Sequence, residues 1–190
     1  MNLDIYLVGV GGQGVLTIAE LIMSAAMKKG MKCNFFPTKG MAQRGGFVKA
    51  QLRIGENMQG PDISRAGADV VISMEQNEAL KAVDFLKPDG DMIVYGYKWQ
   101  PTDVMLKKAD YPEVALVEKE AKKRAKNYTY VPTEGLKEGG AENIYLLSAA
   151  QKNTVLGEFL SKDDLLDAIY ERFPKAKERN AESFEAGQKI

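Results

Sequence analysis

The chain has 190 residues, of which 45% are hydrophobic, and its 26 Lys and Arg balance its 26 Asp and Glu, so the net charge is zero. Without a basic excess we expect no nucleic-acid partner, and without an apolar run of about 20 residues or a secretion signal we expect no membrane association and a cytoplasmic location. There is no histidine, and the single cysteine, Cys33, can neither ligate an iron–sulfur cluster alone nor form an internal disulfide, so it is read as a small buried hydrophobe.

The first predicted elements are a strand and a helix joined by glycines. The apolar run Ile5–Val8 is typical of a buried parallel strand. The apolar spacing over Val15–Met27 predicts a helix that packs one face on a sheet. Between the two stands the sequence GVGGQG, residues 9–14. This order of strand, glycine turn and helix places backbone N–H groups where a ligand can reach them.

The glycine turn is the first candidate binding site. We expect Gly9 to allow the tight turn, Gly11 to allow close approach of a ligand, and Gly14 to allow close packing of the helix on the strand. Gly12 and Gln13, whose amide both donates and accepts hydrogen bonds, complete the predicted site. Its ligand would be a phosphate or another anion. The alternative is a compact turn that binds nothing.

The next predicted strand, Lys32–Pro37, lacks the acid of an NAD site. Such a site needs a carboxylate about 20 residues beyond the glycines to bind the ribose. No Asp or Glu occurs between Glu20 and Glu56, so NAD is disfavoured. Lys39 or Arg44 would suit the 2′-phosphate of NADP. A self-sufficient NADP- or nucleotide-binding protein therefore stays open as an alternative, as does a regulatory or scaffold domain that binds an acyl-CoA or a nucleotide.

A second glycine-containing loop follows this strand. The candidate partner or substrate loop comprises Gly40, Met41, Gln43, Arg44, Gly45 and Gly46. Its glycines permit backbone conformations that other residues avoid, and the Arg44 guanidinium offers a planar set of donors for a carboxylate or phosphate. The apolar Met41 favours a loop shaped to fit against another surface. The alternative is an exposed loop with a solvated arginine.

The remaining chain repeats strands and helices with short connections. Strands are expected at Phe47–Ile54, Asp69–Met74, Met92–Tyr95 and Tyr128–Pro132, a turn at Lys87–Gly90, and helices near residues 78–83, 117–126, 143–160, 161–173 and 181–188. Phe47–Ile54 alternates like a half-exposed strand, and Ser161 with Asp164 resembles a capping box. We predict an α/β fold: one Rossmann-like three-layer domain over residues 1–190, with helices on both faces of a mostly parallel sheet and room for an antiparallel member.

Three further features have a structural and a functional interpretation. Glu75 follows a strand and is expected to cap a helix. Tyr95, Tyr97 and Trp99 form either an interface patch or a half-buried aromatic cluster. The charged stretch Val117–Lys126 is read as a solvated helix face with Glu–Lys and Glu–Arg pairs one turn apart.

With both glycine motifs placed, the chain resembles the gamma subunits of the 2-oxoacid:ferredoxin oxidoreductases over nearly its whole length. The resemblance rests on VGVGGQGVLT at 8–17, KGMAQRGG at 39–46, GADVVISMEQNEAL at 67–80, and a tail with Asn153, Leu156, Gly157, Arg172, Phe173, Pro174, Asn180 and Gly187. Within this group GMAQRGG is most similar to the small (beta) subunit of indolepyruvate:ferredoxin oxidoreductase, although Lys39 stands where we expect His, Tyr or another residue.

The resemblance implies a gamma-type domain within an enzyme complex that oxidatively decarboxylates a 2-oxoacid to an acyl-CoA and reduces ferredoxin. An indolepyruvate-type aryl pyruvate is the favoured substrate. Thiamine diphosphate, Mg and the iron–sulfur clusters would lie on one or more larger partner subunits, which also link the complex to ferredoxin. This chain would supply a glycine-loop anion site, with coenzyme A as candidate ligand, and a partner interface. It would hold no catalytic residue and no metal, and would be inactive alone.

Overall fold

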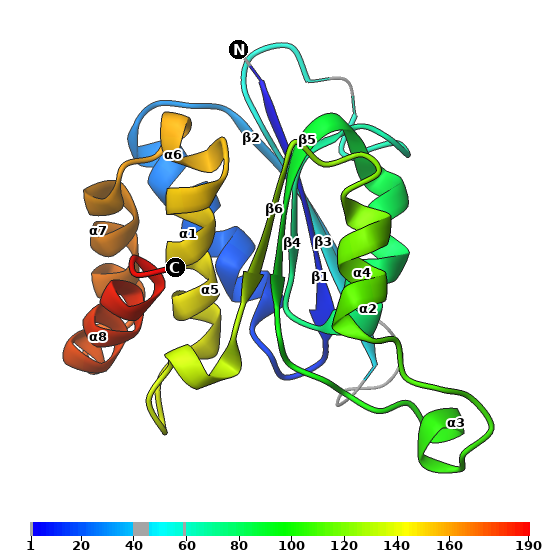
Figure 1. The fold of residues 1–190 in the computed structure, drawn as a ribbon. Coiled ribbons are helices and arrows are strands. Elements are labelled where there is room, and N and C mark those ends of the chain that lie inside the picture. Colours follow the sequence, from blue (N-terminus) through cyan, green and yellow to red (C-terminus); the bar gives the residue numbers. More distant parts are fainter. Residues whose placement is uncertain (1, 40–45, 59) are drawn as a thin grey trace.

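The computed structural model describes residues 2–39, 46–58 and 60–190. Six strands form one sheet in the order β2-β3-β1-β4-β5-β6 (Figure 1). The strands are β1 (Leu3–Val10), β2 (Cys33–Lys39), β3 (Phe47–Ile54), β4 (Ala68–Ser73), β5 (Leu86–Tyr95) and β6 (Asn127–Val131). β3 lies between β1 and β2 and is antiparallel to both, whereas β1, β4, β5 and β6 pair in parallel. The mostly parallel sheet with an antiparallel member is confirmed.

Helices cover both faces of the sheet, as predicted (Figure 1). The helices are α1 (Val15–Lys28), α2 (Gln76–Ala82), α3 (Thr102–Met105), α4 (Val114–Ala121), α5 (Glu142–Asn153), α6 (Leu156–Phe159), α7 (Lys162–Arg172) and α8 (Lys177–Gly187), with 3₁₀ turns η1 (Val83–Phe85) and η2 (Thr133–Gly135). α1 and α5 lie on one face, and α2 and α4 on the other. α7 and α8 form an outer layer, because they pack on α1 and α5 respectively.

The alternation of β1 builds a separate core on each face. Leu3, Ile5 and Leu7 point into the core beneath α1 and α5, while Tyr6 and Val8 point into the core beneath α2 and α4. All five side chains are at most 3% exposed. A strand that is buried on both faces reads as a continuous apolar run, which is why the sequence pattern identified it.

α5 is buried on all sides because α8 covers its outer surface. Every residue from Ile144 to Ala150 is buried. α8 approaches closely through Gly187, where a Cβ atom would lie 2.3 Å from the carbonyl oxygen of Tyr145. Ser148 Oγ donates a 2.5 Å hydrogen bond to the carbonyl of Phe184, so the polar atom inside this contact is satisfied. This packing fixes the end of α5 that lines the site described below.

Several local expectations were wrong. Lys87–Gly90 lies inside β5 instead of forming a separate turn, at a point where the β4–β5 register shifts and Asp89 has a φ of 62°. Gln51, expected on the exposed side of β3, is 1% exposed, because its side chain binds Asp62 and the N–H of Ile63. The single helix expected over 143–160 is divided at Thr154, whose hydroxyl donates to the carbonyl of Ala150.

Other expectations were confirmed in part. The capping box of Ser161 and Asp164 is present at the start of α7. Glu118 pairs with Lys122 at 2.5 Å as expected, but Arg124 turns to Asp84 instead of Glu120. Cys33 is half-buried against the core, and burial raises the pKa of its thiol, which makes it a poor nucleophile. Within the part of the chain that the structure describes, none of the helices has the length and apolar character needed to cross a membrane.

Candidate functional site

The glycine turn lies at the carboxyl end of β1, where a ligand of an α/β sheet is expected. Gly9 belongs to the strand and not to the turn: a Cβ atom there would lie 2.7 Å from Val15 Cγ2 and 2.9 Å from Met74 Cβ. The turn itself begins at Gly11, and Gly12 adopts a φ of 100°. The position predicted to allow the turn therefore allows α1 and the end of β4 to approach the strand instead.

Gly14 joins the glycine turn to α5. It is the N-cap of α1 with a φ of 81°, a conformation that favours glycine. A Cβ atom on Gly14 would lie 2.6 Å from Asn143 Nδ2. The close packing predicted for this glycine is therefore directed at the first turn of α5 and not at the strand. The starts of α1 and α5 are held side by side as a result.

The Gln13 side chain is used within the protein. Its Oε1 accepts a 2.9 Å hydrogen bond from the N–H of Val10, and its Nε2 donates a 2.8 Å hydrogen bond to the carbonyl of Met74. This amide thus links the end of β1 to the end of β4. Its donor and its acceptor therefore position the glycine turn.

The two glycine motifs are in direct contact. The N–H of Gly11 donates a 2.8 Å hydrogen bond to the carbonyl of Gly46. Gly46 precedes β3, whose first residue, Phe47, pairs with Val10. The other residues predicted for the partner or substrate loop, Gly40, Met41, Gln43, Arg44 and Gly45, lie outside the described residues. The end of that loop nevertheless meets the glycine turn.

The N-terminus of α1 offers backbone N–H donors that form no hydrogen bond with any described residue. Gly14 has no side chain to cap the helix, and the first turn of α1 contains no acidic residue. The first N–H groups of a helix have no partner within it, and they carry the positive end of the helix dipole. An anion near Gly12, Gly14 and Thr17 would be stabilised by both effects.

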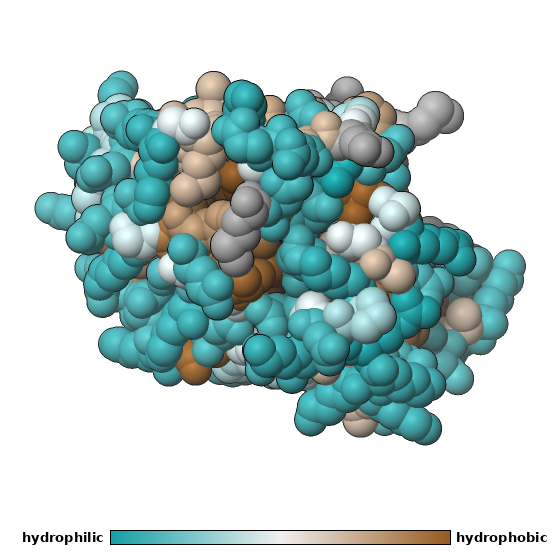
Figure 2. Space-filling model, turned by 90° about the horizontal axis from the view of Figure 1, so that it is seen from above, coloured by the Kyte–Doolittle hydropathy of each residue, from teal (hydrophilic) through white to brown (hydrophobic). Residues whose placement is uncertain are grey.

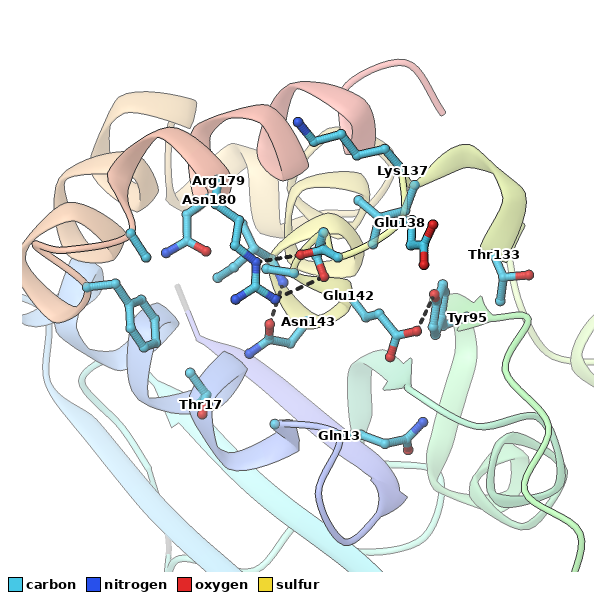
Figure 3. Close-up of a pocket in the computed structure, with 18 of the residues that line it drawn as sticks. Gln13, Thr17, Tyr95, Thr133, Lys137, Glu138, Glu142, Asn143, Arg179 and Asn180 are labelled. Carbon is cyan, nitrogen blue, oxygen red and sulfur yellow. Dashed lines mark hydrogen bonds between the residues drawn. The ribbon is translucent and has the colours of Figure 1, made fainter.

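A cavity of 540 Å³ opens beside this helix end. Figure 3 shows Gln13 and Thr17 on one side of it, with Arg179 and Asn180 of α8 opposite. Other polar groups on its wall are Tyr95, Thr133, Lys137, Glu138, Glu142 and Asn143. The cavity is therefore formed by the ends of β1 and β5, the start of α1, the segment from η2 to the start of α5, and α8.

α8 contributes a cation and an amide. Arg179 donates from Nε to the carbonyl of Gly139 at 2.7 Å and from Nη2 to the carbonyl of Gly140 at 3.2 Å, which orients its guanidinium. Asn180 is 4% exposed, and its side chain makes no hydrogen bond with any residue that the structure describes. The residue lines the cavity, and its amide can both donate and accept hydrogen bonds. Asn180 is therefore the residue of this wall most clearly available to a ligand.

The carboxylate of Glu142 is engaged on the far wall. It accepts a 3.0 Å hydrogen bond from the hydroxyl of Tyr95, which is 1% exposed. Burial and the neighbouring Glu142 charge raise the pKa of Tyr95 well above its ordinary value, so the phenol stays protonated. Lys137 pairs with Glu182. Because cations and carboxylates both line the cavity, an anion would depend on the α1 N-terminus more than on a general positive field.

Comparison with known proteins identifies the family. The family model described as pyruvate ferredoxin/flavodoxin oxidoreductase matches residues 4–190. The chain belongs to this family. The match covers the glycine turn, the loop before β3 and the α8 wall of the cavity. The resemblance stated from the sequence is thus confirmed.

Relatives in this family are named as subunits. The indolepyruvate oxidoreductase subunit IorB of Archaeoglobus fulgidus is 44% identical over 114 residues, which cover 60% of this chain and 56% of that protein. Subunit IorB of Methanothermobacter thermautotrophicus is 30% identical over 176 residues, covering 92% of this chain and 89% of that protein. The chain thus spans little more than half of the Archaeoglobus relative's length.

Solved structures share the fold. Pyruvate oxidoreductase subunit PORC of Thermotoga maritima aligns with a TM-score of 0.73 at 19% identity, covering 99% of this chain and 96% of that one. A 2-oxoglutarate:ferredoxin oxidoreductase of Magnetococcus marinus, solved with 2-oxoglutarate, coenzyme A and succinyl-CoA, aligns with a TM-score of 0.71 at 19% identity, covering 99% of this chain and 30% of that one. At these identities the likeness establishes the fold alone.

The strand order of this family member differs from that of a dinucleotide-binding sheet. In that sheet the second strand lies next to the first, and its end binds the ribose beside the glycine turn. Here β3 separates β1 from β2. The end of β2 at Lys39 is therefore one strand away from the glycine turn. This geometry gives the NADP alternative no ribose site next to the glycines.

Sequence reasoning missed the α8 wall. Asn180 was noted only as part of the resemblance, and Arg179 was not considered, because the last helix was expected to start at 181 and starts at Lys177. Both residues are about 165 positions from the glycine turn in sequence, so no local pattern connects them. Among the described residues no group of three or more His, Cys, Asp or Glu could hold a metal ion.

Proposed function

We propose that this chain is the small subunit of a 2-oxoacid:ferredoxin oxidoreductase complex, and that residues 1–190 form a single gamma-type domain. The family match over residues 4–190 carries this proposal. The names of the archaeal relatives and the fold shared with the Thermotoga subunit support it. The complex would convert a 2-oxoacid to an acyl-CoA and pass the electrons to ferredoxin.

The redox centres would belong to a larger subunit. A chain with one cysteine and no histidine has too few ligands for an iron–sulfur cluster, so clusters do not fit this protein. Thiamine diphosphate with its Mg, which activates the 2-oxoacid in this class of enzyme, would lie on that larger subunit as well. This chain would bind coenzyme A and position it for the reaction.

Coenzyme A would bind in the cavity beside α1. Its thiol accepts the acyl group, and its phosphates are anions of the kind that a helix N-terminus stabilises. The first N–H groups of α1 and the cavity-lining amide of Asn180 would hold one phosphate, and the fixed guanidinium of Arg179 would face it. Gly46, the last residue of the candidate partner or substrate loop, accepts a hydrogen bond from Gly11 of the same turn.

An aryl pyruvate such as indolepyruvate is the proposed 2-oxoacid. Support comes from the relatives named as indolepyruvate oxidoreductase subunits, one of which aligns with 92% of this chain. The test is to purify the tagged chain from its native source and assay viologen reduction with indolepyruvate, pyruvate and 2-oxoglutarate, with coenzyme A and thiamine diphosphate supplied. We expect a brown, larger partner and the fastest turnover with indolepyruvate, whereas the isolated chain should be inactive. A colourless homo-oligomer that reduces a nicotinamide would contradict the proposal.

The coenzyme A site has its own test in the assembled complex. Asn180→Ala and Arg179→Gln should each raise the apparent KM for coenzyme A and leave the KM for the 2-oxoacid unchanged. Arg65→Gln is the matched control, because that side chain is 79% exposed and lies outside the cavity lining. Equal coenzyme A dependence in the Asn180→Ala, Arg179→Gln and control complexes would rule out this cavity as the site.

A further inference from the structure

Residues 96–112, within the connection between β5 and α4, leave the body of the protein and return to it; we call them the arm. Figure 1 shows its helix, α3, standing away from the other elements. The arm has internal order, since the N–H of Leu106 donates to the carbonyl of Thr102 and the N–H of Lys108 to that of Asp103, both at 2.8 Å. It is a folded projection of the chain.

The buried carboxylate of Glu75 holds both ends of the arm. Glu75 is 1% exposed and caps α2, as predicted, by accepting a 2.8 Å hydrogen bond from the N–H of Glu78. Its other oxygen accepts hydrogen bonds from the N–H of Trp99, at 3.0 Å, and from the hydroxyl of Tyr111. One carboxylate therefore links the first and the last part of the arm to the start of α2.

Gln76 strengthens the same anchor. Its N–H donates to the carbonyl of Tyr97 at 3.1 Å, and its side-chain Nε2 donates to the carbonyl of Pro112 at 3.0 Å. Burial, followed by the hydrogen bond to Glu75, raises the pKa of Tyr111 far above its ordinary value, so its hydroxyl stays a donor. The arm consequently has a fixed direction relative to the sheet.

The projecting part of the arm is apolar at its surface. Trp99, Met105 and Leu106 are 41%, 68% and 57% exposed. Lys107, directly after them, has a φ of 57°, a backbone conformation that costs energy in any residue with a side chain. Tyr95, by contrast, packs edge to face on Tyr145 in the core, so the tyrosine and the tryptophan do not form one cluster. An anchored arm with exposed apolar residues next to a strained one is typical of a contact surface.

The arm and the glycine turn lie at the same edge of the sheet. Gln13 of the turn donates to the carbonyl of Met74, and the next residue is the anchor Glu75. Trp99 and the glycine turn are therefore both fixed to the end of β4. The opposite end of the molecule, seen in Figure 2, presents mainly hydrophilic residues, with hydrophobic ones visible in its hollows.

We propose that the arm docks into the larger, cofactor-bearing subunit, with Trp99, Met105 and Leu106 inserted into an apolar pocket of that partner. The inference rests on the proposed function. Each side of a specific interface buries roughly 800 Å², more than three side chains supply, so the arm must act together with an adjoining surface. The adjoining surface is the glycine-turn edge, which has to face the larger subunit because coenzyme A bound there must reach the thiamine diphosphate of that subunit.

The first test measures assembly of the complex. Met105→Ser combined with Leu106→Ser should weaken binding of the larger subunit at least tenfold and leave the unfolding temperature of the isolated chain unchanged. Met27→Ser is the matched control, since Met27 is 58% exposed but lies near the far end of α1. Unchanged assembly in the double variant would overturn the inference. So would a wild-type homodimer that the same substitutions dissociate.

The second test observes the arm directly. Trp99 is the only tryptophan of the chain, so 5-fluorotryptophan labelling gives a single ¹⁹F resonance. Addition of the larger subunit should shift and broaden this resonance. A complex that forms without any change in the resonance would contradict docking by the arm and leave the proposed function intact. A wild-type chain that binds no larger subunit at all would instead overturn the proposed function, and the arm inference with it.

Discussion

Replacement of Gly14 by alanine tests how the glycine turn is held against α5. The backbone at Gly14 has a φ of 81°, and a non-glycine residue in this region costs about 1–2 kcal/mol. The new Cβ atom would also lie 2.6 Å from Asn143 Nδ2 and 3.3 Å from Asn143 Cβ. Overpacking of this kind costs a further ~1–3 kcal/mol. We expect Gly14→Ala to lower the free energy of unfolding by roughly 2–5 kcal/mol in total, and Gly14→Val by more.

A double-mutant cycle separates the two contributions. Asn143→Ala removes the group that the Cβ atom meets, so Gly14→Ala in that background should cost only the ~1–2 kcal/mol of backbone strain. Gly12→Ala is the control, because Gly12 has a φ of 100° but no atom within 4 Å of its Cβ position, and its cost should add to that of Asn143→Ala. Urea unfolding of the isolated chain gives each value. If the free-energy costs of Gly14→Ala and Asn143→Ala simply added in the double variant, the close approach of residues 14 and 143 would be refuted.

Three other substitutions are expected to have distinct effects. Gly9→Ala, which places a Cβ atom 2.7 Å from Val15 Cγ2, should destabilise the chain by about 1–3 kcal/mol in urea unfolding without altered backbone strain. The hydroxyl of Tyr128 is buried and has no partner among the described residues, so Tyr128→Phe should unfold at an equal or higher urea concentration. Burial raises the pKa of Tyr128 to about 12, so stability from this residue is present below pH 10 and lost toward pH 12, and Tyr128→Phe should flatten that decline. Arg44→Lys keeps the charge but loses the planar set of donors, and should weaken assembly or the response to coenzyme A by roughly 1–3 kcal/mol while the unfolding temperature of the isolated chain stays constant.

The fold was predictable where the pattern is local. β1 and α1 could be placed because an apolar run and a helical period adjoin a glycine turn, and both signals lie within 25 residues. β3 was placed at its observed bounds from alternation alone, yet the burial of Gln51 was missed. That burial depends on Asp62 and Ile63, which fold back over the strand. Alternation predicts which face a side chain takes but not what later covers that face.

Of the candidate site, only the part formed by backbone N–H groups could be predicted from the sequence. The glycine turn and the start of α1 follow from residues adjacent in sequence. The opposite wall depends on α8, and its helix was expected four residues too late, which placed Arg179 and Asn180 outside any predicted element. Helix ends are decided by capping contacts, and here the N-cap, Ala176, has no side-chain cap that a sequence pattern could reveal.

The sequence and the structure argue by independent routes against a classical NAD ribose site next to the glycines. In the sequence, the acid expected about 20 residues beyond the glycines is missing. In the structure, β3 occupies the position beside β1 that the acid-bearing strand would have. The carbonyl of Gly46 also accepts a hydrogen bond from the N–H of Gly11. Restoring an acid at the end of β2 would therefore not create a dinucleotide site, because the intervening strand would remain. The feature that remains beside the glycines is the N-terminus of α1, which has no side-chain cap and can stabilise an anion without recognising a sugar.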